Sequence, residues 1–74
     1  MRKPFRDKIK NFYLFRAKIK YELTLRNWTY ADLGELTGYA GNYIQKMMSG
    51  TYGSRKAAFA VLKALGIDTK PFRW

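Results

Sequence analysis

The side chains that could do chemistry in this chain of 74 residues are cations and hydrogen-bond donors, because the usual catalytic groups are scarce. The chain has no His, no Cys and only five Asp or Glu residues. It therefore lacks the commonest metal ligands, general bases and thiol nucleophiles. We expect no enzymatic activity, no metal site and no cofactor.

Asn42 and Lys46 are the strongest candidates for a binding role, because they stand four residues apart in a segment with helical spacing. Side chains with this spacing lie one turn apart on the same side of a helix. An Asn side chain can form two hydrogen bonds with adenine, and a Lys side chain can donate to guanine. Tyr43 and Gln45 flank the pair and have a hydroxyl and an amide for phosphate contacts. Ordinary exposed polar positions would show the same pattern.

The charge of the chain favours a polyanionic partner. Fifteen Lys and Arg residues against five acidic residues give a formal net charge of +10, and nucleic acid is the commonest intracellular polyanion. Residues 1–26 hold nine of the basic residues against Asp7 and Glu22. A solvated face, phosphate contacts and docking of a protein partner all remain open for this segment.

Length and hydropathy predict one domain, residues 1–74, with an apolar core and no disulfides. The longest uncharged apolar run, residues 57–62, is too short for a membrane span or a signal peptide. We expect a soluble cytoplasmic protein that does not bind membranes or a small-molecule substrate.

The N-terminal third shows two competing periods. Between residues 16 and 26 apolar and polar residues alternate, which is typical of a strand. Over a longer stretch the apolar residues recur with a mean spacing of 3.6, the helical period. They are Phe5, Ile9, Phe12, Phe15, Ile19 and Leu23. We predict one helix from residue 5 to 26, with residues 1–14 forming a basic extension in which Phe5 and Ile9 lie beyond the core.

Two short helices are predicted next, joined by a tight turn. Thr29 and Asp32 have the spacing of an N-terminal cap, and Gly38 can end the helix that follows. Leu33 and Leu36 are expected on its buried side. The next helix runs from about residue 40 to 48 and stops at Gly50. This arrangement predicts a helix-turn-helix, whose second helix enters the major groove of DNA.

The sequence resembles the lambda-repressor-like, or XRE-type, helix-turn-helix family, which includes phage repressors and Cro proteins. The resemblance covers residues 15–67 and rests on Thr29, Leu33, Gly34, Leu36, Gly38, Ile44 and Gly50. It implies a compact all-α domain of four to five helices, with a fourth helix over residues 54–65 and a short tail over residues 68–74. Leu23 and Met48 stand where many members have an Arg–Glu pair, and Gly34 stands where Ala is usual. We expect Leu23 to pack on Met48, and we assign Trp28 and Phe59 to the core.

The resemblance also implies a set of DNA-binding residues and a bacterial or phage-infected host cell. Double-stranded DNA would be the partner, bound by a homodimer. The residues expected to contact bases are Gly41, Asn42 and Lys46, and those expected to contact the DNA backbone are Tyr30, Tyr43, Gln45, Arg55 and Lys56.

The leading hypothesis is a sequence-specific, Cro-like transcription regulator of phage or mobile-element type. The alternative is a protein-binding modulator, such as an antirepressor that docks on a repressor. A nucleoid-type protein that binds DNA without sequence preference is a third possibility. Anchors for a protein partner or a second copy would be Phe5, Ile9, Phe72 and Trp74, although Phe72 and Trp74 would equally suit a tail that folds back on the core.

Overall fold

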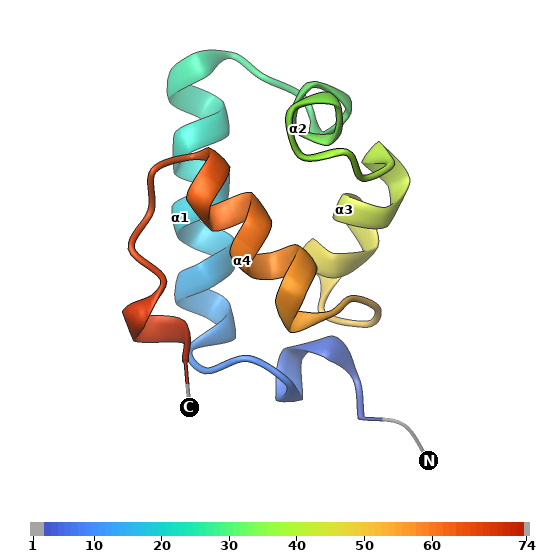
Figure 1. Cartoon of the computed structure of the whole chain (residues 1–74), viewed down its shortest axis with the longest axis vertical. Helices are drawn as coiled ribbons and strands as arrows, with labels where there is room; N and C mark the ends of the chain where they lie inside the picture. Colours follow the sequence, from blue (N-terminus) through green and yellow to red (C-terminus); the bar gives the residue numbers. More distant parts are fainter. Residues whose placement is uncertain (1–2, 74) are drawn as a thin grey trace.

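Every regular element in the part of the chain that the structure describes, residues 3–73, is helical (Figure 1). The structure is a computed structural model. In chain order the elements are the 3-10 turn η1 (Phe5–Asp7), the helices α1 (Phe12–Arg26), α2 (Tyr30–Thr37), α3 (Gly41–Ser49) and α4 (Arg55–Ala64), and the 3-10 turn η2 (Lys70–Phe72). The predicted all-α class with four helices is confirmed.

The first α-helix begins at Phe12, so the prediction of one helix from residue 5 to 26 is wrong for residues 5–11. Asn11 has a left-handed backbone conformation, with φ 57° and ψ 48°, which ends any helix that approaches it from the N-terminal side. Phe5 and Ile9 are buried, with exposed fractions of 1% and 2%. Burying each of these side chains contributes about 1.5 to 3 kcal/mol, which exceeds the helix propensity of the residues involved.

Hydrogen bonds hold the N-terminal segment, residues 3–11, across one end of the helical body. The Arg6 N–H donates to the carbonyl of Gly50 over 3.0 Å. The Asn11 side-chain amide donates to the carbonyl of Pro71 over 2.8 Å. The segment therefore lies against the body, and the predicted basic extension of helix one is absent from residues 3–11.

The tail folds back on the same end of the molecule. Phe72 is buried and meets the ring of Phe15 edge-on, with 5.9 Å between the ring centres. Its carbonyl accepts a hydrogen bond from the Lys10 N–H over 3.2 Å. Phe5, Ile9 and Phe72 are thus core residues. The prediction that Phe5 and Ile9 are docking anchors beyond the core is wrong, and for Phe72 the alternative of a tail folded back on the core holds. Trp74 lies outside the described residues.

Helix α1 is apolar on two opposite faces. Its buried face carries Phe12, Phe15, Ile19 and Leu23. The opposite face carries Leu14, Ala17, Tyr21 and Leu25, all exposed, with Tyr21 62% exposed. The alternation in the sequence therefore comes from two faces of one helix, and the strand alternative is wrong.

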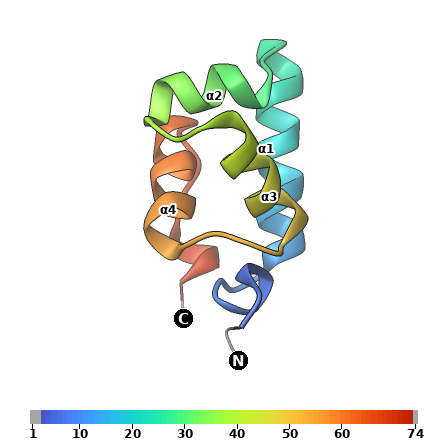
Figure 2. The same cartoon turned by 90° about the vertical axis from the view of Figure 1, so that its right-hand side faces the viewer.

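Helices α2 and α3 form the predicted helix-turn-helix. The Thr29 hydroxyl accepts from the Asp32 N–H over 3.2 Å, and the Asp32 carboxylate accepts from the Thr29 N–H over 2.8 Å. This reciprocal pair caps the start of α2. Gly38 ends α2 in a left-handed conformation, with φ 84°. The turn of residues 38–40 leads directly into α3, and Figure 2 shows α2 lying across the upper end of α3.

Two glycines allow α2, the turn and α3 to approach closely. A Cβ atom on Gly34 would overlap the carbonyl oxygen of Tyr39 in the turn. A Cβ atom on Gly41 would lie 3.2 Å from both the Cα and the N of Ala31 in α2. A glycine is thus required at position 34 for steric reasons, and this requirement outweighs its lower helix propensity.

The buried residues of the described chain are apolar, apart from backbone at glycine positions. Leu23 and Met48 are both buried in this core, and Phe59 is partly buried against it. Two assignments are wrong. Trp28 is 36% exposed, with the Arg26 guanidinium 5.4 Å from its ring centre, and Leu36 is 54% exposed because Leu33 and Gly34 form the buried side of α2.

Candidate nucleic-acid interface

The solvent face of α3 carries polar side chains along its length, ending at the exposed Ser49. Asn42, Gln45 and Lys46 are exposed. Ile44, Met47 and Met48 point to the opposite side and are buried in the core. The buried residues fix the rotation of α3, so the three polar side chains are held toward solvent on one face.

Gly41 and Tyr30, two further predicted contact residues, are the first residues of α3 and α2, lie close together in space and are half-buried. Gly41 packs against Ala31 of α2 and offers only its backbone to a ligand. Tyr30 packs against the core, so only its outer part meets solvent. Both residues therefore contribute to the packing of α2 and α3, and only part of each is accessible to a ligand.

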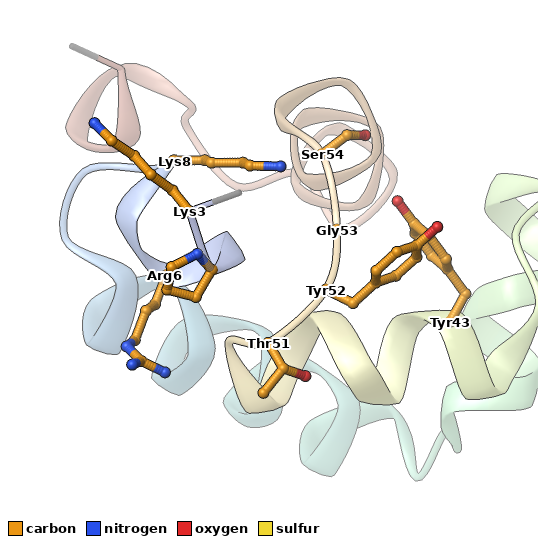
Figure 3. Close-up of a pocket in the computed structure, with 9 residues that line it drawn as sticks. Lys3, Arg6, Lys8, Tyr43, Thr51, Tyr52, Gly53 and Ser54 are labelled. Carbon is orange, nitrogen blue, oxygen red and sulfur yellow. The ribbon is translucent and has the colours of Figure 1, made fainter. Parts of the chain in front are cut away.

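Tyr43 is the central member of a cluster of three aromatic rings. Its ring stacks on Tyr39 at 5.5 Å between centres, with 16° between the ring planes. On its other side Tyr52 meets it edge-on at 5.4 Å. Tyr43 is half-buried by these contacts, whereas Tyr52, in the loop between α3 and α4, is exposed. Figure 3 shows the hydroxyl groups of Tyr43 and Tyr52 extending in a similar direction.

Arg55 and Lys56, both predicted to contact phosphates, are exposed in the first turn of α4. The Ser54 hydroxyl caps this helix by accepting from the Ala57 N–H over 3.1 Å. The Arg55 Nε–H donates to the carbonyl of Lys8 over 2.8 Å. This bond ties the start of α4 to the N-terminal segment, a link that the sequence did not suggest.

A groove of about 540 Å³ opens between the N-terminal segment and the α3–α4 loop (Figure 3). We call it the basic groove. Three cationic side chains and two tyrosines line it, and none of its lining residues is acidic. Its full lining is Lys3, Pro4, Arg6, Lys8, Tyr43, Thr51, Tyr52, Gly53 and Ser54.

Buried residues position the basic groove from beneath. Gly53 lies so close to Phe5 and Met47 that a Cβ atom at position 53 would come within 3.0 Å of the Phe5 ring and 2.8 Å of the Met47 Cγ. The Arg6 N–H is bonded to the carbonyl of Gly50 at the end of α3. The backbone that carries Arg6 and Lys8 is therefore set at a defined place beside α3.

The sequence interpretation left phosphate contacts open for the basic residues of the N-terminal third, but it did not assign Lys3, Arg6 and Lys8 to the site. It placed them on a projecting helix, whereas the structure brings them to residues 51–54. The one local signal was Asn11, a residue type that tolerates the left-handed conformation found there. The partners of Asn11 lie far along the chain, so this signal was weak.

Two other classes of site are not seen in the described part of the chain. No helix between residues 3 and 73 has the length and apolar character needed to span a bilayer. Over the same range, no three His, Cys, Asp or Glu side chains gather as ligands for a metal ion.

The site thus consists of the polar face of α3, the start of α4 and the basic groove. In Figure 2 the loop between α3 and α4 passes just above the N-terminal segment. Comparisons with protein families, with curated proteins and with solved structures find no match to this chain.

Proposed function

We propose that this protein is a sequence-specific DNA-binding regulator of the Cro-like type found in phages and mobile elements. It acts in the cytoplasm by binding and not by catalysis. The observation that carries the proposal is the solvent face of α3, where Asn42, Gln45 and Lys46 are exposed on a helix held against α2 by a three-residue turn. A helix presented in this way fits the major groove of B-form DNA.

The residues of the site then divide by role. Asn42 pairs with adenine and Lys46 donates to guanine, because each can reach a base edge from the exposed face of α3. Gln45, Arg55 and Lys56 contact phosphates, which position the protein but carry no sequence information. A homodimer is the expected binding species if the operator is palindromic, since each copy supplies one α3.

The test begins with selection of a preferred sequence from a pool of random duplexes. Fluorescence anisotropy then measures the affinity for the selected duplex and for random duplex at two salt concentrations. We expect Asn42→Ala and Lys46→Ala each to reduce the discrimination between the two duplexes by about 1 to 3 kcal/mol. Arg55→Ala should weaken both complexes alike.

Lys18→Ala is the matched control, because Lys18 is an exposed cation on α1 and lies outside the site. It should leave the discrimination unchanged. Equal affinity for every sequence would favour a nucleoid-type protein without sequence preference. Absence of duplex binding by the wild-type protein at low salt would reject the proposal.

One observation favours the second candidate function, a protein-binding modulator. The outer face of α1 exposes Leu14, Tyr21 and Leu25 together, and exposed apolar clusters are typical of protein interaction sites. The helix that the sequence predicted to project beyond the core, with Phe5 and Ile9 as docking anchors, is not present in residues 3–11. If a Leu14→Ser, Leu25→Ser variant lost regulatory activity while keeping full DNA affinity, the modulator function would be favoured.

A further inference from the structure

We propose that the basic groove binds the phosphate backbone of duplex DNA beside the base pairs that α3 reads. This inference rests on the proposed function and assigns a second contact region to it. The N-terminal segment acts as a fixed wall of that region, with Lys3, Arg6 and Lys8 as its cations.

The chemistry of the lining suits a phosphodiester. The Lys8 side chain reaches across the groove toward Ser54, and Lys3 and Arg6 add positive charge at its rim, with their charged ends directed away from the loop (Figure 3). The hydroxyls of Tyr52 and Ser54 are neutral donors for the anionic oxygens of a phosphate. No carboxylate lines the groove to repel an anion. Arg55 and Lys56 at the start of α4 add two exposed cations next to Ser54.

The position of the groove suits the backbone that flanks a major-groove helix. Tyr43 belongs to α3 and lines the groove, and Thr51 to Ser54 follow α3 directly along the chain. A DNA strand that leaves the major groove occupied by α3 would therefore pass over the basic groove.

Rigidity distinguishes this wall from a flexible basic arm. Phe5 and Ile9 anchor the segment in the core, the Arg6 N–H donates to the Gly50 carbonyl, and the Lys8 carbonyl accepts from the Arg55 side chain. Little conformational freedom is lost when pre-positioned cations meet phosphates, so the contacts favour binding more than those of a free arm would.

The test compares two triple variants with the same net charge. The groove variant is Lys3→Gln, Arg6→Gln, Lys8→Gln. The control is Lys18→Gln, Lys20→Gln, Lys63→Gln, which removes three exposed cations from α1 and α4. None of the changed side chains supplies a hydrogen bond that holds the N-terminal segment, so both variants should fold, and thermal unfolding followed by circular dichroism checks this.

Affinity for random duplex and for the selected duplex is then measured between 50 and 200 mM salt. Each phosphate contact contributes about 0.9 to the slope of log affinity against log salt, so three contacts contribute about 2.7. For the groove variant the loss of affinity over this fourfold range should shrink by about 40-fold relative to wild type. The control should stay within about threefold of wild type, and discrimination between the duplexes should be unchanged in both variants.

Equal effects of the two triple variants would overturn the inference, because they would show a general effect of net charge. An unchanged salt slope in the groove variant, with duplex binding intact, would also overturn it while leaving the proposed function in place. Failure of the wild-type protein to bind any duplex at 50 mM salt would reject both.

Discussion

At Gly34 two effects on stability oppose each other. Replacing a helical glycine by alanine stabilises a helix by about 1 kcal/mol through propensity. The new Cβ atom, however, would overlap the carbonyl oxygen of Tyr39, a backbone atom that cannot rotate away. Overpacking of this kind costs about 1 to 3 kcal/mol. We predict that Gly34→Ala lowers the free energy of unfolding, measured by urea titration.

Glu35→Ala is the neighbouring control for that prediction. Glu35 is exposed on α2, so its replacement should change the free energy of unfolding by no more than about 0.5 kcal/mol. A Gly34→Ala protein more stable than wild type would show that propensity outweighs the close approach of α2 and the turn.

At the scale of elements, the packing of the N-terminal segment on the core can be tested by its effect on stability. Phe5 is buried against Phe12 and Phe15, with ring centres 6.0 Å and 5.8 Å away. Phe5→Ala should therefore lower the free energy of unfolding by about 3 to 5 kcal/mol, the usual cost of truncating a buried Phe. On a projecting helix the same change would have almost no effect.

Lys10→Ala is the control within the same segment, because Lys10 is exposed and its backbone bond to Phe72 does not need the side chain. Phe5→Leu should retain part of the lost stability if Phe5→Ala leaves too little folded protein to measure. A fully stable Phe5→Ala protein would contradict the packing of η1 on the core.

The elements that could be predicted from sequence are those with local start and stop signals. The Thr29–Asp32 cap, Gly38 and Gly50 act within a few residues, and the two helices they bound were found close to their observed limits. The limits of α4 came from the family resemblance and are also close to those observed. The polar face of α3 was predicted for the same reason, since helical spacing alone places Asn42 and Lys46 outward.

The start of α1 and the basic groove could not be predicted in this way. The left-handed conformation of Asn11 accompanies contacts with Pro71 and Phe72, about sixty residues away. Helical periodicity continues through residues 5–11, so the pattern favoured a helix that tertiary burial overrides. The groove joins residues 3–8 to residues 51–54, and no local pattern indicates that pairing.

For the whole molecule, the two ends of the described chain stabilise each other. A domain of this size has a free energy of unfolding of about 4 to 11 kcal/mol, at about 0.05 to 0.15 kcal/mol per residue. Removing residues 70–74 deletes the buried Phe72 and the carbonyls that accept from Lys10 and Asn11. We predict a loss of at least about 3 kcal/mol, measured by urea unfolding.

Hydrogen exchange adds a local measurement to that experiment. The amides of Arg6 and Lys10 should lose protection in the shortened protein more than the amides in the middle of α4 do. Phe72→Leu, which keeps the backbone acceptors and most of the apolar volume, should preserve protection at both amides. Unchanged protection of Lys10 after the deletion would contradict the link between the two ends.

The joining of residues 10 and 11 to η2 also sets an order of events during protein synthesis. The N-terminal segment leaves the ribosome first, yet the carbonyls that hold Lys10 and Asn11 belong to residues 71 and 72. Contacts so distant along the chain form late, because a long loop must close before they are made. The helix-turn-helix can therefore assemble on a nascent chain that still lacks its finished basic groove. If the protein binds DNA as proposed, a chain that lacks its last residues should hold DNA less tightly than the whole protein.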